Sequence, residues 1–156
     1  MAPPLAAVSR SEYDKDPSAR FWALVDYLGR NNVPQADRQL EVVRLAYFYD
    51  AEVLNGGHLQ YFINRGTNEA PAVLTALEVL GDLERAALLR SCLAKATASP
   101  LPEIKSLDAY ADLAKERSFR FEDTRYYELQ PELLQRIQDF IAGKLPELVE
   151  VREDAD

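Results

Sequence analysis

Two adjacent glycines, Gly56 and Gly57, interrupt the most strongly helical part of this chain. The segment before them, residues 37–54, carries apolar side chains on almost every face of its second half. Such a helix needs neighbours on all sides, so the pattern predicts a central helix buried inside a bundle. Glycine adopts left-handed backbone conformations at little cost, so the pair predicts that the helix ends here and that the chain restarts at a new angle.

Residues 55–57, here called the joint, are surrounded by polar side chains that an ordinary helical hairpin does not need. A break inside a core strands backbone donors and acceptors, and each buried unpaired group costs about 1–3 kcal/mol. Asn and Gln can satisfy both kinds of group. We therefore interpret the stretch as a structural motif, which comprises Glu52, Asn55, Gly56, Gly57, Gln60, Tyr61 and Asn64. On this interpretation Gly56 is left-handed, Gly56→Val destabilises strongly and His58→Phe is mild.

A second interpretation places an enzyme or a small-ligand pocket beside the joint, lined by Glu52, Asn55, His58, Gln60 and Tyr61. In its catalytic form, Glu52 would be a base and His58 an acid or proton shuttle. No nucleophile motif accompanies them. One histidine and one cysteine are too few for the usual zinc sites, and no phosphate-binding glycine loop is present. We therefore expect a protein that is not an enzyme and that has no metal and no cofactor.

The rest of the chain also reads as helical, with proline and glycine marking the breaks. Further helices are predicted near residues 16–29, 58–65, 68–81, 83–96, 106–117 and 131–144, and a loop with at most one helical turn at 119–130. No run alternates convincingly between apolar and polar residues, so no strand is predicted. We expect an all-α, single-domain, irregular bundle of about six to eight helices. Residues 1–15 would be a flexible arm, 16–148 the domain, and 149–156 a frayed acidic tail.

The charge of the chain limits what it can bind. The formal net charge is -8, from 18 basic and 26 acidic residues. Residues 1–100 carry 12 acids and 10 bases (net -2), whereas residues 101–156 carry 14 acids and 8 bases (net -6). Nucleic acids and anionic membranes attract basic proteins, so we expect neither as a direct partner. No apolar run approaches the roughly 20 residues of a membrane span, and the single cysteine fits a reducing compartment, so we expect a cytoplasmic protein.

Carboxylates gather in the acidic half of the chain. Asp108, Asp112 and Glu116 are spaced so that they share one helix face, with about one charge per 6 Å. With Glu122, Asp123 and Glu128 they are the predicted contacts to a basic protein partner, and the alternative is a solvated face that only aids solubility. Duplex DNA carries about one charge per 1.7 Å, so several helices, or two subunits of a homodimer, would be needed to imitate it.

The stretch "YFYDAEVLNGGHLQYFINRG" resembles the signature of the DNA-mimic-protein-19-like domain, a bacterial family otherwise of unknown function. The matching positions are Glu52, Asn55, Gly56, Gly57, Gln60, Tyr61, Phe62 and Asn64. Residues 38–95 resemble the family well, through "APAVLTALEVLGDLERAALL", and "FEDTRYYEL" at 121–129 is similar to a later segment. The resemblance implies an all-helical domain whose acidic surface occupies the DNA-binding face of a transcription regulator. His58 stands where the family usually has an aromatic residue, which favours a packing role at this position.

Overall fold

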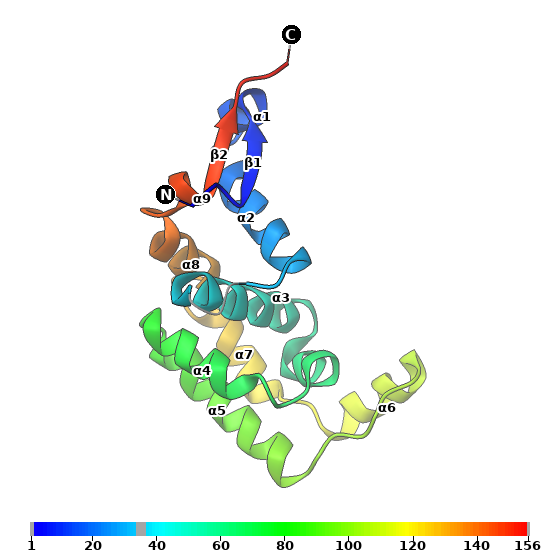
Figure 1. Ribbon diagram of the computed structural model, residues 1–156. Helices are drawn as coiled ribbons and strands as arrows, with labels where there is room; N and C mark the ends of the chain where they lie inside the picture. Colours follow the sequence, from blue (N-terminus) through cyan, green and yellow to red (C-terminus); the bar gives the residue numbers. More distant parts are fainter. Residues whose placement is uncertain (1, 34–36, 156) are drawn as a thin grey trace.

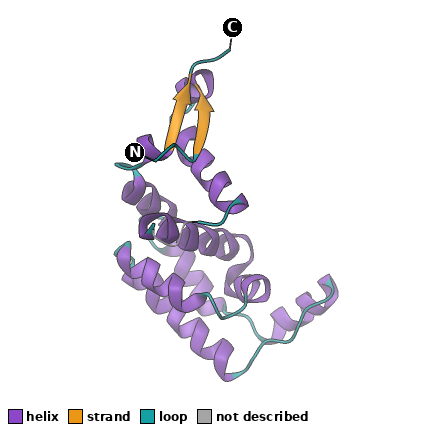
Figure 2. Ribbon diagram, in the orientation of Figure 1, coloured by secondary structure: helices purple, strands orange, loops and turns teal. Residues whose placement is uncertain are grey.

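The computed structural model describes residues 2–33 and 37–155, and this part of the chain is helical apart from one small sheet (Figures 1 and 2). The all-α prediction is confirmed. In chain order the elements are β1 (Ala6–Ser9), α1 (Arg10–Lys15), α2 (Ala19–Arg30), α3 (Arg38–Arg65), α4 (Ala70–Val79), α5 (Leu83–Ala98), α6 (Leu107–Glu116), α7 (Arg120–Glu128), α8 (Leu133–Ile141), α9 (Leu145–Leu148) and β2 (Val149–Arg152).

Helix α3 is the centre of the fold, as the apolar segment at 37–54 predicts. It packs against α2, α4, α5, α7 and α8, and Val43, Ala46 and Val53 on it are fully buried. The helix begins where the side chain of Asp37 accepts a hydrogen bond from the backbone N–H of Leu40, at 3.1 Å. This cap satisfies one of the free donors at the helix start. Figure 1 shows α3 crossing the middle of the molecule and turning at its second half.

Helices α4 and α5 form a hairpin that lies beside α3 and supports α7. The sequence predicts both helices, near residues 68–81 and 83–96. Gly81 is left-handed with φ 74°, and the side chain of Asp82 then accepts from the backbone N–H of Arg85 at 3.2 Å. Helix α7 contacts both α5 and α3, so the hairpin helps to hold α7 against the central helix.

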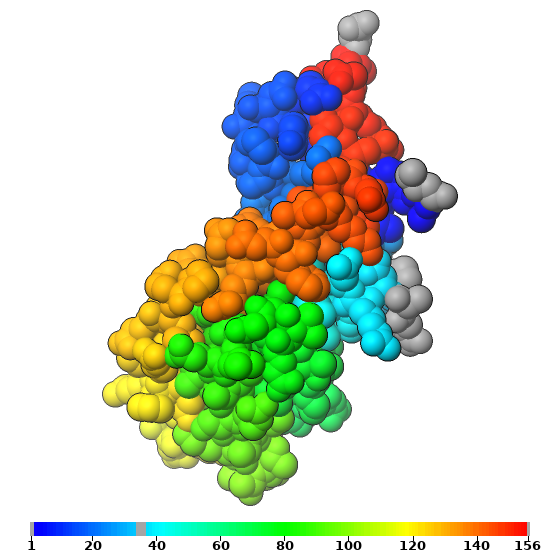
Figure 3. Space-filling model, turned by 90° about the vertical axis from the view of Figure 1, so that its left-hand side faces the viewer, coloured from blue at the N-terminus to red at the C-terminus, as the bar shows by residue number. Residues whose placement is uncertain are grey.

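The predictions of a flexible arm at 1–15 and a frayed tail at 149–156 are wrong for most of both segments. β1 and β2 pair in parallel, from Ala6 opposite Val149 to Ser9 opposite Arg152. One face of this sheet packs on α2. Strands of four residues are too short to show an alternating pattern, and the two strands lie at opposite ends of the sequence. Figure 3 shows the first and last segments side by side at one end of the molecule. The outer limits of the domain, 16 and 148, stay a prediction.

The predicted loop at 119–130 is also wrong, because residues 120–128 form α7. Its inward face carries Glu122 and Tyr126, which are buried, and few aliphatic residues. From sequence such a face looks like a solvated segment. Packing against α3 and α5 stabilises the helix instead.

Helix α6 stands apart from the other helices, projecting to one side in Figure 1. Its inner face reaches the body of the protein through Leu113, which is buried, and through Tyr110, whose hydroxyl lies 3.5 Å from the carbonyl oxygen of Gly56. The rest of the helix is mostly exposed, including Leu107. The predicted helix at 106–117 is therefore confirmed, and it presents one whole face to solvent.

Candidate functional site

The joint breaks α3 as predicted, but the left-handed residue is the second glycine. Gly56 has φ -155° and ψ 19°, whereas Gly57 has φ 75° and ψ -176°. The expectation that Gly56 is left-handed is therefore wrong. A Cβ atom on Gly57 would lie 2.4 Å from Oδ2 of Asp123. Glycine is needed at position 57 both for its backbone conformation and because a carboxylate packs directly against it.

Asp123 of α7 caps the second half of α3. Its Oδ1 accepts from the backbone N–H of His58 at 3.0 Å and lies 2.7 Å from Nδ1 of the same residue. The other ring nitrogen, Nε2, is 2.7 Å from the hydroxyl of Tyr49. A carboxylate can only accept, so Nδ1 donates to it, and in the neutral ring Nε2 then accepts from the Tyr49 hydroxyl. Burial raises the pKa of Tyr49 well above its usual value, which keeps that hydroxyl protonated. His58 is 0% exposed, and through its bond to Asp123 it links α3 to α7 inside the core.

A second set of buried polar side chains, centred on Asp50 and Arg85, lies between α3, α5 and α7. Asp50 accepts a hydrogen bond of 2.5 Å from the hydroxyl of Tyr126, and the guanidinium of Arg85 lies 4.9 Å from the centre of that ring. Arg85 also donates to Asp82 at 2.6 Å and to the carbonyl oxygen of Leu129 at 3.2 Å. Burial raises the pKa of Asp50, against the opposing effect of the Tyr126 hydrogen bond. These contacts join α3, α5 and α7 and are structural in character.

The predicted motif residues meet on the outer side of the joint. Glu52 Oε2 accepts from the amides of Gln60 and Asn64, each at 2.9 Å, and Oε1 lies 3.5 Å from Nε of Arg65. Burial raises the pKa of Glu52, but these hydrogen bonds outweigh it, and the pKa is lowered overall. Glu52 thus ties the two halves of α3 together across the bend.

The two remaining motif residues take different positions. Tyr61 is buried, with its ring edge-on to Tyr49 at 5.0 Å between ring centres. Its hydroxyl has no hydrogen-bond partner among residues 2–33 and 37–155. Asn55 is exposed at the outside of the bend. Tyr61 therefore serves packing, and Asn55 lies outside the Glu52 cluster.

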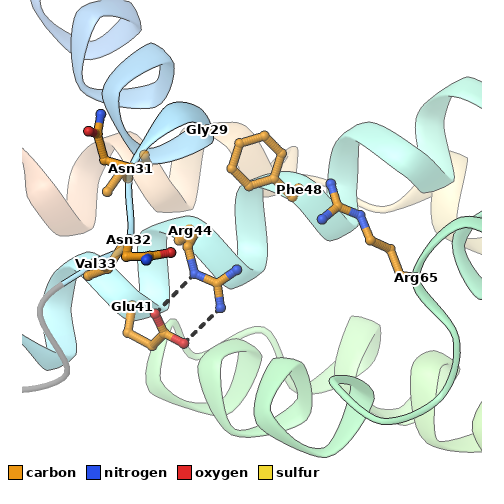
Figure 4. A pocket seen from close by; sticks show the side chains of 9 residues that line it. Gly29, Asn31, Asn32, Val33, Glu41, Arg44, Phe48 and Arg65 are labelled. Atoms are coloured by element: carbon orange, nitrogen blue, oxygen red, sulfur yellow. Dashed lines mark hydrogen bonds and ion pairs between the residues drawn. The ribbon is translucent and has the colours of Figure 1, made fainter.

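The structure separates the two residues that the catalytic interpretation needs. Glu52 belongs to the outer cluster with Gln60 and Asn64, whereas His58 is enclosed between Asp123 and Tyr49. A cavity of about 710 Å³ lies elsewhere, between the end of α2 and α3, and none of the five residues predicted for a pocket beside the joint lines it (Figure 4). In the described part of the chain, no three His, Cys, Asp or Glu side chains are arranged to hold a metal ion.

The joint, the α4–α5 hairpin and α7 all fall within one family match. The model of the DMP19-like protein family matches residues 34–144, which is most of the chain. This chain belongs to the DMP19-like protein family. No curated protein and no solved structure shows significant similarity to it. The terminal sheet and α2 lie outside the segment that the family shares. Within the described residues, no helix is long and apolar enough to cross a membrane.

The acidic residues of this DMP19-like chain divide into two groups. Asp108, Asp112 and Glu116 are exposed on α6, and Glu128 is exposed at the end of α7. The prediction that Glu122 and Asp123 belong to the same surface does not fit the structure. Glu122 is 2% exposed and bonds Lys95 and Ser91, and Asp123 caps the joint. Neighbouring residues on a helix point in different directions. Glu122 and Asp123 are therefore close to Glu128 in sequence but do not share its exposed face.

Sequence reasoning missed His58, Asp50 and Tyr49 as partners in the interior of this DMP19-like domain. His58 follows two glycines and looks like a residue at an exposed helix start. The signal that could have indicated its role is its place beside apolar residues of the central helix, since a polar ring in an apolar place needs polar partners. Its main partner, Asp123, is 65 residues away in the chain, and spacing alone does not connect them.

Glu122 makes the stability of the protein sensitive to acid. Burial raises its pKa, but the bonds from Lys95 and Ser91 outweigh this effect and lower it below 4.5 overall. A carboxyl group whose pKa is lower in the folded state than in the unfolded state stabilises the fold at pH values above its unfolded-state pKa. This stabilisation is lost as the pH falls through the folded-state pKa. We therefore expect the free energy of unfolding to fall less between pH 7 and pH 3 in Glu122→Gln than in the wild type. Urea unfolding at both pH values measures this. Glu116→Gln, at an exposed site, is the control, and an equal fall in both variants contradicts the prediction.

Proposed function

We propose that this protein is a non-enzymatic interaction protein whose acidic surface occupies the DNA-binding surface of a basic partner, such as a transcription regulator. Membership of the DMP19-like family supports the general class. The observation that carries the proposal is the outer face of α6, where Asp108, Asp112 and Glu116 are all exposed. A DNA-binding partner would place the complex in the cytoplasm.

The arrangement of α6 suits contact with a second protein. The helix projects from the body, so a partner can approach its outer face without meeting other helices (Figure 1). Asp112 has a side chain 80% exposed, and its only ion pair in the described residues is a 4.0 Å contact with Lys115, which is equally exposed. Ion pairs this exposed contribute little free energy, so the Asp112 carboxylate remains available to contact a partner.

The density of negative charge on α6 limits how closely this surface can imitate DNA. Carboxylates one helical turn apart give about one charge per 6 Å, against about 3.4 Å between phosphates along a DNA strand. The α6 stripe alone therefore presents about half the charge density of one strand. A homodimer that places two stripes side by side would supply a second row, and we propose this as the form that binds.

The test starts from a pull-down with the full chain in an extract of the organism that makes it, followed by calorimetric titration of the recovered protein. We expect a basic DNA-binding protein whose affinity falls with rising salt and whose own DNA site competes for binding. Exposed ion pairs contribute about 0.5 kcal/mol each, so the triple variant Asp108→Asn, Asp112→Asn, Glu116→Gln should bind about tenfold more weakly.

The matched control is the triple variant Asp26→Asn, Glu84→Gln, Asp139→Asn, which removes the same charge from exposed positions on α2, α5 and α8. Its binding should stay close to that of the wild type. Equal losses in both triple variants would mean that net charge alone matters. Binding that ignores salt and is not displaced by DNA would rule out an acidic surface of the proposed kind.

A further inference from the structure

The cavity between α2 and α3 has the size of a small-molecule site, and its lining mixes apolar side chains with several polar and charged ones. Its volume of about 710 Å³ lies within the usual range of about 300–1,000 Å³ for such pockets. Apolar walls come from Leu28, Val33 and Phe48. Polar groups come from two asparagines at the end of α2 and from Glu41, Arg44 and Arg65 of α3. Figure 4 shows these side chains around the cavity, with the guanidinium of Arg65 turned toward Phe48.

Arg65 is held in place by the motif at the joint. Its Nε lies 3.5 Å from Glu52, which is itself fixed by Gln60 and Asn64. Its guanidinium carbon lies 5.3 Å from the centre of the Phe48 ring. The two terminal nitrogens have no hydrogen-bond partner within residues 2–33 and 37–155, and the side chain is 35% exposed. The Glu52 cluster therefore orients a guanidinium whose outer edge is free to donate.

Arg44 is the second fixed donor. The carboxylate of Glu41 accepts hydrogen bonds from Nε and Nη2 of Arg44, at 3.0 and 2.8 Å. A carboxylate oxygen of Glu69 lies 3.7 Å from Nη2. These bonds leave Nη1 without a partner among the described residues, and the side chain is only 23% exposed. Guanidinium groups with a free edge bind carboxylate oxygens well, because their donors are fixed in one plane.

Gly29 shapes the apolar wall between the two helices. A Cβ atom there would lie 3.3 Å from Cζ of Phe48, so glycine lets α2 approach the ring closely. The ring is thus fixed from one side by α2, and from another by Arg65. A flat apolar group entering the cavity would lie beside Phe48 with the arginine donors within reach.

We propose that this cavity binds a small organic monocarboxylate, whose flat apolar body packs against Phe48 and whose carboxylate accepts hydrogen bonds from Arg65 and Arg44. The charged residues that line the cavity are these two arginines and Glu41, and the arginines also pair with Glu69 and Glu52, which do not line it. A dianion would meet those glutamates, so one negative charge is the better match. The site is distinct from the acidic face of α6 and does not depend on it.

The probe is 2-naphthoate, titrated into the full chain and followed by amide chemical shifts and calorimetry. We expect saturable shifts at the end of α2 and along α3 near Arg44, Phe48 and Arg65. Uncharged 2-naphthamide tests the carboxylate, and acetate tests the ring, and both should bind at least about tenfold more weakly. Arg65→Gln, which can still bond Glu52, should weaken 2-naphthoate by about tenfold.

The matched control is Arg90→Gln, an arginine of α5 paired with Glu78 and outside the cavity lining. It should bind 2-naphthoate as the wild type does, and thermal unfolding of both variants establishes that each is folded. The proposal is overturned if the two variants lose affinity equally, if 2-naphthamide binds as tightly as 2-naphthoate, or if no saturable shifts appear at the cavity lining.

Discussion

Gly57→Ala is expected to destabilise the protein by about 3–4 kcal/mol. The backbone at φ 75° and ψ -176° lies in a region that is essentially limited to glycine, and it costs a residue with a Cβ atom about 1–3 kcal/mol. The remainder comes from Asp123, whose Oδ2 would lie 2.4 Å from the new atom. The carboxylate must move, and its two hydrogen bonds to His58 weaken. Urea unfolding followed by circular dichroism measures the loss.

Gly66→Ala is the matched control for this substitution. Gly66 is also left-handed, with φ 67°, but nothing lies within 4 Å of its Cβ position. It should therefore show the backbone cost without the cost of displacing Asp123. A Gly57→Ala variant that loses no more stability than Gly66→Ala would mean that the Asp123 cap contributes little.

His58→Phe is expected to destabilise by about 2–4 kcal/mol, in place of the mild effect that the sequence suggests. The phenyl ring fills the space but leaves the Tyr49 hydroxyl buried without its partner, and Asp123 loses the 2.7 Å contact with Nδ1. Each lost partner costs about 1–3 kcal/mol when the group that remains is buried. The free energy of unfolding in urea reports the sum.

A double substitution separates the hydrogen bonds from the shape of the ring. In Tyr49→Phe with His58→Phe, the stranded hydroxyl is removed together with its acceptor. We expect this double variant to be less destabilised than the sum of the two single variants, by about 1 kcal/mol or more. Simple additivity would show that Tyr49 and His58 do not stabilise each other.

The sequence predicts local features of this fold well and long-range pairings poorly. The central helix and the bend can be predicted from the apolar pattern and the two glycines. The Glu52 cluster can be predicted in part, because Gln60 and Asn64 lie on one face of the short helix after the bend. Asp123, which caps His58, lies 65 residues away on another helix. The partners of Glu122, Lys95 and Ser91, lie 27 and 31 residues away on a third. Periodicity carries no information on such contacts. For the same reason α7 and the terminal sheet were missed, since packing rather than pattern stabilises them.

The cap that Asp123 provides to His58 has a consequence for how the chain is made. During synthesis α3 leaves the ribosome long before α7, so the first amide after the bend has no acceptor until residue 123 has also emerged. The contribution of Asp123 to the bend is therefore added late, when α7 docks. A chain truncated before α7 would keep its glycines and the Glu52 contacts across the bend, but it would lack the cap on His58.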